Sequence, residues 1–196
     1  QSPSLGKTNN APIIGNVLIS EVHYHPIESD TEESGEFVEI WNHTDAEVLL
    51  FNPEMPEHTW KLKGLGFSFP QGQSLSPGEC AVIAKLEPMI FRKRHQLDAS
   101  VKVYGPFEGA LGNSGERLTL TCPEAPVMDN EKLVIPMVPV DSLRYNDKSP
   151  WPTEPDGSGR TLERQRALSM TDEPKHWRAS DKLGGSPGRP TNTLPN

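Results

Sequence analysis

The chain has 196 residues, of which 34% are hydrophobic, 23% charged and 7% aromatic, and this length suits one domain of ordinary size. Twenty prolines and sixteen glycines divide it into short elements and exclude a helical bundle or a long coiled coil, because proline fits neither a helix interior nor a central strand. The net charge of −8 disfavours non-specific binding to nucleic acid, and no apolar run is long enough to predict a transmembrane helix.

The two ends of the chain differ in character from its middle. Residues 1–12 and the stretch from residue 184 onward are polar and rich in proline, glycine or asparagine, a composition typical of flexible linkers. We expect a flexible linker at residues 1–12, a folded domain at 13–192 and a flexible tail at 193–196. A folded body between linker-like ends suggests a module of a longer chain.

Inside the body, apolar residues recur with a period of two, which is the signature of half-buried strands. In the clearest case Val38 and Ile40 point to one face of a strand. Phe37, Glu39 and Trp41 point to the other face. Strands are expected at residues 16–23, 36–42, 59–63, 80–85, 101–104, 117–122, 138–145 and 161–165, and one helix at 87–97. About eight short strands with one short helix predict an all-β sandwich.

Four groups of segments stand out by their order and spacing. The first is LISEVHYHP at 18–26 with GEFVEIWN at 35–42; the second is WKL at 60–62, FP at 69–70 and LSPG at 75–78; the third is GPFEGALGNSGE at 105–116; the fourth is SPWP at 149–152, DGSGRTLER at 156–164, WRAS at 177–180 and GGSPG at 184–188. In this order they resemble the bacterial lamin-tail domain, the prokaryotic relative of the immunoglobulin-like tail of nuclear lamins. The resemblance covers roughly residues 16–192.

This resemblance implies an immunoglobulin-like β-sandwich with one short helix. It also implies a module of a larger exported or cell-surface bacterial protein, and hence an extracellular location. The family has no established catalytic residues to transfer, and fold alone does not settle function. We therefore expect a non-catalytic interaction or spacer module whose partner is a protein or a cell-surface polymer.

A pair of histidines is the most chemical-looking feature of the sequence. His23 and His25 are two residues apart in a strand, so both imidazoles can point to one metal ion, with Glu21 or His43 completing the site. Pro26 follows at once and ends the strand, so two histidines packed at the rim of the sandwich explain the same pattern. A calcium- or zinc-binding accessory or enzymatic domain centred on Glu21, His23 and His25 is the alternative function; otherwise no cofactor is expected.

Two acidic residues, Glu21 and Glu39, lie in the middle of apolar strands. Paired carboxylates can bind a hard cation or perform acid–base chemistry, but basic side chains or backbone N–H groups can also satisfy a buried carboxylate structurally. The structural interpretation is favoured. The sequence lacks the nucleophile-elbow, metalloprotease, phosphate-loop and dinucleotide motifs, so no catalytic residue is assigned and no enzyme is expected.

Two surfaces are candidates for binding. Phe37, Glu39 and Trp41 share one strand face, which offers an apolar patch to a partner if that face is open. Exposed, coplanar aromatic rings would favour a third interpretation, a carbohydrate-binding module. The basic cluster at residues 91–95 (FRKRH) is better explained as a solvated helix face than as a nucleic-acid site, since the chain is acidic and the cluster lacks interleaved aromatics.

The chain has two cysteines, Cys80 and Cys122. Cys80 begins one expected strand and Cys122 ends another, so the two residues can approach each other if these strands pair antiparallel. A disulfide then requires their Cα atoms to lie within about 7 Å. Two free thiols acting as small apolar side chains are the alternative.

Overall fold

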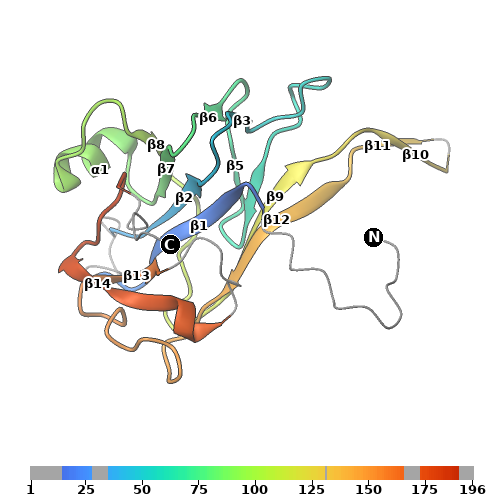
Figure 1. The fold of residues 1–196 in the computed structure, drawn as a ribbon. Coiled ribbons are helices and arrows are strands. Elements are labelled where there is room, and N and C mark those ends of the chain that lie inside the picture. Colours follow the sequence, from blue (N-terminus) through green and yellow to red (C-terminus); the bar gives the residue numbers. More distant parts are fainter. Residues whose placement is uncertain (1–14, 28–34, 131, 166–172, 190–196) are drawn as a thin grey trace.

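A computed structural model describes residues 15–27, 35–130, 132–165 and 173–189. The linker expected at residues 1–12 and the tail expected at 193–196 lie outside the described residues. The described chain is mostly β, with one short α-helix (Figure 1). No helix in the described ranges is long and apolar enough to cross a membrane.

Two sheets make up the body. The larger has the strand order β14 (Trp177–Leu183), β13 (Arg160–Arg164), β1 (Val17–His23), β2 (Phe37–Asn42), β7 (Cys80–Ala84), β8 (Lys102–Tyr104). The smaller has the order β12 (Met137–Arg144), β9 (Arg117–Pro123), β4 (Lys61–Lys63), β5 (Phe67–Ser68). Neighbouring strands are antiparallel except β7 and β8, which are parallel. Two further pairs are β3 (Val48–Leu49) with β6 (Ser74–Leu75) and β10 (Val127–Asp129) with β11 (Lys132–Val134).

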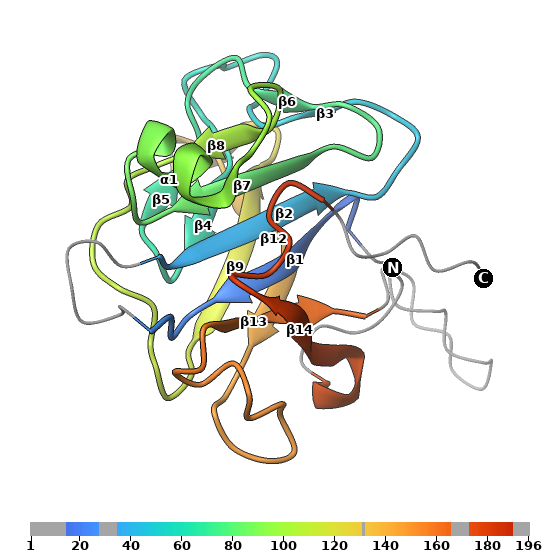
Figure 2. The same ribbon diagram turned by 90° about the vertical axis from the view of Figure 1, so that its left-hand side faces the viewer.

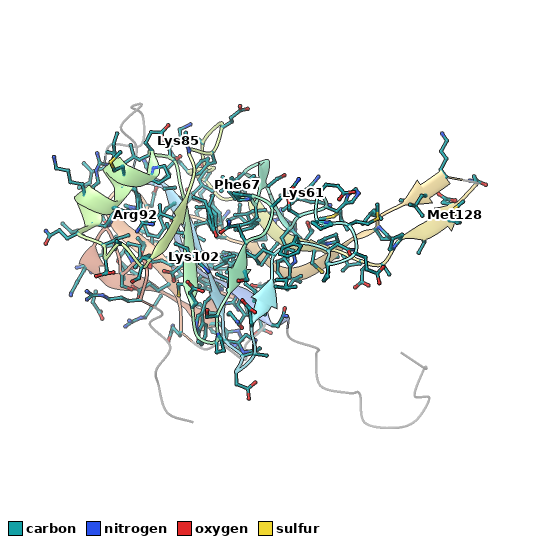
Figure 3. All side chains as sticks on the ribbon, turned by 90° about the horizontal axis from the view of Figure 1, so that it is seen from above. Lys61, Phe67, Lys85, Arg92, Lys102 and Met128 are labelled. Atoms are coloured by element: carbon teal, nitrogen blue, oxygen red, sulfur yellow. The ribbon has the colours of Figure 1, made fainter. Side chains whose placement is uncertain are left out.

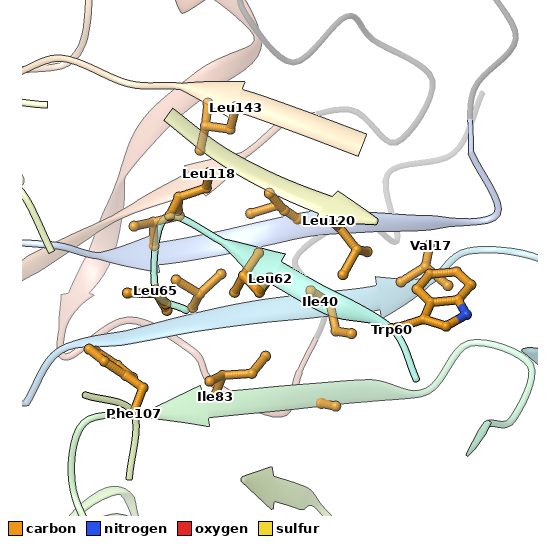
Figure 4. Close-up of a cluster of buried hydrophobic side chains, with 14 of the residues drawn as sticks. Val17, Ile40, Trp60, Leu62, Leu65, Ile83, Phe107, Leu118, Leu120 and Leu143 are labelled. Carbon is orange, nitrogen blue, oxygen red and sulfur yellow. The ribbon is translucent and has the colours of Figure 1, made fainter. Parts of the chain in front are cut away.

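The main core lies between the two sheets. One cluster of buried side chains joins the two sheets (Figure 4). It includes Ile40 and Ile83 of the six-stranded sheet and Leu62 and Leu118 of the four-stranded sheet, each with no exposed surface. Strand side chains alternate between faces, so this inner face collects the apolar positions of each strand. The arrangement confirms the prediction of a mostly β body in which Val38 and Ile40 point inward.

A β-bulge in β1 determines which of its residues face the core. The register of β1 against β2 shifts between Ile19 and Glu21, so that Ile19 lies in the core while Glu21 points to the outer face. Asp141 of β12 accepts a hydrogen bond from the Ile19 N–H (2.8 Å), and the buried guanidinium of Arg164 donates to the Ile19 carbonyl (2.7 Å) and to Asp141 (2.6 Å). The Arg164 guanidinium also lies 5.0 Å from the centre of the Trp177 ring.

The α-helix covers one end of the outer face of the six-stranded sheet. It is α1 (Pro88–His95), slightly shorter than the expected 87–97, and it ends where Gln96 adopts a left-handed conformation (φ 52°). Phe91, the buried residue of this helix, packs edge-on against Phe37 with ring centres 5.4 Å apart. They belong to a second cluster, which comprises Phe37, Val82, Ala84, Leu86, Phe91 and Val103.

A hairpin projects from the opposite side of the molecule. The strands β9 and β12 lead into β10 and β11, which extend away from the body (Figures 1 and 3). Their apolar side chains are open to solvent, with Met128 67% and Leu133 58% exposed. This arm contributes nothing to the outer face of the six-stranded sheet.

Candidate functional site

Three buried glutamates form a row across neighbouring strands on the outer face of the six-stranded sheet. Glu21 of β1 lies opposite Glu163 of β13 on one side and Glu39 of β2 on the other. Each of the three residues is no more than 2% exposed. A buried carboxyl group is costly unless it is hydrogen-bonded, so this row requires donors close by.

The segment that follows β14 supplies several of these donors. Residues 184–189, here called the strap, cross in front of β1 and β2 (Figure 2). The Ser186 N–H donates to Glu21 Oε1 (3.0 Å), and the Gly188 N–H donates to Glu39 Oε2 (2.6 Å). The glycine-rich stretch that resembled the start of a linker in the sequence is therefore bound to the sheet, up to residue 189.

A glycine inside the strap allows this close approach. Gly185 has a positive φ of 67°, and a Cβ atom at this position would lie 1.7 Å from Glu21 Oε1. Any other residue would both strain the backbone and collide with the carboxyl group. The strap can lie this close to the glutamates only because residue 185 has no side chain.

Side chains of the sheet provide the remaining partners of Glu21 and Glu39. Thr161 Oγ1 donates to Glu21 Oε1, and Ser20 Oγ donates to Glu39 Oε1, both at 2.6 Å. Burial, together with repulsion from Glu39, raises the pKa of Glu21 well above its usual value, and burial raises the pKa of Glu39 to about 7. Burial therefore favours the neutral form of both carboxyl groups.

The third glutamate borders an open groove. Glu163 accepts hydrogen bonds from Arg178 (3.0 Å) and from Ser186 Oγ (3.2 Å). The groove beside it has a volume of about 590 Å³ and lies between the end of α1, strand β14 and the strap. Its charged lining residues are Arg94, Glu163, Arg178, Asp181, Lys182 and Arg189. Basic residues outnumber acidic ones in this groove, although the chain as a whole is acidic.

A smaller recess of about 250 Å³ shares Arg94, His95 and Leu183 with the groove. His23, which is 4% exposed, lies at this recess beside Phe37. Within the described chain, neither ring nitrogen of His23 forms a hydrogen bond of ordinary geometry, and neither does Nε2 of His95. Burial lowers the pKa of both histidines to about 4, so both rings are neutral near pH 7.

The binding patch expected on β2 is covered. Phe37 is buried under α1, and Glu39 is buried under the strap. Trp41 is half-buried at the end of the same strand, near His43. The three residues share one face, as the alternation predicts. The patch required this face to be uncovered, and the helix and the strap cover it at Phe37 and Glu39.

The three candidate metal ligands do not converge. Glu21 points under the strap, His23 points to the small recess, and His25 Nδ1 lies 2.5 Å from Asp156 Oδ1. Throughout the described ranges, no three His, Cys, Asp or Glu side chains are grouped so that they could hold one metal ion. The strand ends directly after His23, which separates His25 from the other two.

The tryptophans form no exposed platform. Trp60 and Trp177 are buried, and Trp41 and Trp151 are half-buried. Trp151 packs against the core with its ring centre 6.5 Å from that of Trp177. This placement counts against sugar binding by stacking on flat aromatic rings.

The strand pairing that a disulfide between Cys80 and Cys122 would require is not formed. Cys80 begins β7 of the six-stranded sheet, whereas Cys122 lies in β9 of the four-stranded sheet, so the two strands do not pair. Both thiols are free, Cys80 buried and Cys122 half-buried. Burial raises the pKa of both thiol groups, and the nearby carboxylate of Glu39 raises that of Cys80 further.

Sequence reasoning missed most residues of the groove. It assigned residues 91–95 to a solvated helix face, which holds for the exposed Lys93 and Arg94. It did not foresee that Arg94 and the half-buried His95 also line the groove and the recess. It gave no role to Lys182 or Arg189, since neither belongs to a motif. The one available signal was the glycine-rich stretch GGSPG at residues 184–188, which follows WRAS at 177–180.

Comparisons of the chain with protein families, with curated proteins and with solved structures found no match.

Proposed function

We propose that this chain is a non-catalytic interaction module of the lamin-tail type, with an immunoglobulin-like sandwich, that belongs to a larger exported or cell-surface bacterial protein. The observation that carries the proposal is the groove between α1 and the strap, a recess of about 590 Å³ with net positive lining on an acidic chain. Ligand sites are typically concave surfaces of this size with a few polar groups that fix orientation.

The composition of the groove favours binding over catalysis. Glu163 is engaged by Arg178 and Ser186, and Glu21 and Glu39 lie beneath the strap. An acid–base catalyst must lie within hydrogen-bond reach of the group that reacts. The strap keeps Glu21 and Glu39 from such contact, which leaves the groove as a surface for recognition.

Co-sedimentation with bacterial cell envelopes tests this function. The folded chain is expected to bind envelopes saturably, and a Lys182→Glu/Arg189→Glu variant is expected to bind less. Lys93→Glu carries one charge reversal on the same helix as Arg94 but outside the groove, and serves as the control. Absence of saturable binding, or release of soluble polymer fragments over time, would contradict a non-catalytic interaction module.

A further inference from the structure

We infer that the groove and the small recess together bind a short acidic peptide segment, with one apolar side chain of that segment in the recess beside His23 and His95. This inference rests on the proposed function and specifies the chemistry of the partner. It depends on three features: the positive charge of the groove, the apolar recess beside it, and the burial or half-burial of all four tryptophans.

The charge of the groove is set by residues of α1, β13, β14 and the strap. Arg178 forms ion pairs with Glu163 (3.0 Å) and Asp181 (3.3 Å), so these three side chains largely satisfy one another. In the described chain, neither Lys182 nor Arg189 forms an ion pair with an acidic side chain. These two side chains present positive charge to a ligand, and such charge steers acidic partners into place.

The recess beside the groove has a different character. Pro26, Ile27 and Leu183 form its apolar wall, and both Ile27 and Leu183 are 66% exposed. The volume of about 250 Å³ suits one apolar side chain, whose burial contributes about 1.5–3 kcal/mol for a residue such as leucine.

Two compartments of this kind match a peptide better than other polyanions. A nucleic acid or an inorganic polyphosphate would use the charged groove but leave the apolar recess empty. Single-stranded nucleic acids and sugars also stack on aromatic rings, and none of the four tryptophans is exposed. A segment with a few acidic residues around one apolar residue uses both compartments.

The decisive experiment measures binding of a fluorescein-labelled pentapeptide, Glu-Glu-Leu-Glu-Glu, to the full chain by fluorescence anisotropy. One-to-one saturable binding that weakens with added salt is expected. Replacing the central leucine of the peptide by asparagine should weaken binding on the order of tenfold, because the recess loses its apolar occupant. Inorganic polyphosphate of equal charge should compete poorly.

Matched variants of the protein locate the site. Lys182→Glu/Arg189→Glu is expected to weaken peptide binding on the order of tenfold, while Lys93→Glu changes it less than about twofold. Leu183→Ser should weaken binding several-fold, whereas Leu133→Ser, an equally exposed position on the arm, should not. Thermal unfolding of each variant confirms that it is folded.

Three results would overturn the inference: no saturable peptide binding, equal loss in the groove and control variants, or tighter binding of polyphosphate than of the peptide. If one of these results is obtained but the chain still binds envelopes and Lys182→Glu/Arg189→Glu weakens that binding, only the inference about the peptide has failed. If the unchanged chain does not bind envelopes, the proposed function itself is contradicted.

Discussion

Strand β2 of the six-stranded sheet is buried on both of its faces, but the two faces differ in composition. The inner face presents Val38 and Ile40 to the apolar core, each with no exposed surface. The outer face presents Glu39 on the same strand, 1% exposed, to the backbone N–H of Gly188. Burial on the inner face therefore depends on the hydrophobic effect, whereas burial on the outer face depends on donors that replace water.

This difference has an energetic consequence. Apolar contacts on the inner face are insensitive to pH, because they contain no titrating group. The outer face holds Glu21 and Glu39, whose raised pKa values show that burial disfavours their charged forms. Along β2, the pH dependence of stability should therefore come from Glu39 on the outer face and not from Val38 and Ile40 on the inner face.

The largest effect is expected at the buried ion pair between Arg164 and Asp141. Arg164→Met removes the partner of Asp141 and the donor to the Ile19 carbonyl, and it leaves a buried carboxylate without its cation. We expect a loss of about 3–5 kcal/mol in the free energy of unfolding, measured by urea denaturation. The double variant Arg164→Met/Asp141→Asn should recover part of this loss; a single variant within 1 kcal/mol of the native chain would show that the pair is dispensable.

The next largest effect is expected in the pH dependence of the free energy of unfolding, through Glu39 on the outer face. The pKa of Glu39 is about 7 in the folded chain against an ordinary value of 4.5, so the folded state keeps a proton that the unfolded state has lost. Its stabilising contribution is complete below about pH 4.5 and is lost as the pH rises to about 7. Relative to Glu39→Gln, which cannot ionise, the native chain should lose about 3 kcal/mol over this range.

Comparison with the variant is essential because other groups titrate in the same range. The pKa values of His23 and His95 are lowered to about 4, so these residues make the folded chain more stable as the pH rises from about 4 to 6.5. Burial also raises the pKa of Glu36 to about 7. The contributions of His23, His95 and Glu36 cancel in the difference between native chain and Glu39→Gln, whereas that of Glu21 does not, because Glu39 itself raises the pKa of Glu21. The difference therefore reports on the two glutamates together, and a difference that is constant with pH would refute the assignment to this pair.

A smaller effect is expected from the strap. Gly185→Ala places a methyl group where Glu21 Oε1 lies and strains a residue with positive φ. We expect a loss of about 2 kcal/mol in the free energy of unfolding. Gly72→Ala, which also has positive φ but open space around it, measures the backbone strain alone, and equal losses in the two variants would show that the contact with Glu21 contributes nothing.

The smallest effect concerns the thiols. Because Cys80 and Cys122 are free, adding a reductant should change the free energy of unfolding by less than about 0.5 kcal/mol, far below the 2–5 kcal/mol typical of losing a disulfide. Alkylation of the folded chain should label the half-buried Cys122 well before Cys80. Mass spectrometry of the unreduced, unfolded chain should then find two alkylated thiols.

Much of the inner face could be predicted from the sequence. Alternation placed Val38 and Ile40 inward, and the eight expected strands and the helix are all present. Both predictions succeed because period-two burial is a local pattern that each strand carries by itself. The helix and the strap form a third layer over the outer face. This layer could not be predicted from the alternation within single strands.

The features that were missed depend on partners far along the chain. The sequence of β14, WRASDKL, has no apolar alternation, and it is a strand because it pairs with β13. The two-residue strands β3, β5 and β6 are too short to show any period. The bulge between Ile19 and Glu21 reverses the faces that simple alternation assigns, and it is stabilised by Arg164, more than 140 residues away.

The strap also has a consequence for how the molecule is made. Glu21 obtains the Ser186 N–H from 165 residues further along the chain, so during synthesis at about 5–20 residues per second the early strands wait seconds for their cover. Until then Glu21 and Glu39 lack the N–H donors of the strap. Charged side chains on a strand surface discourage pairing with other chains, so we expect these two carboxyl groups to disfavour aggregation of the nascent sheet.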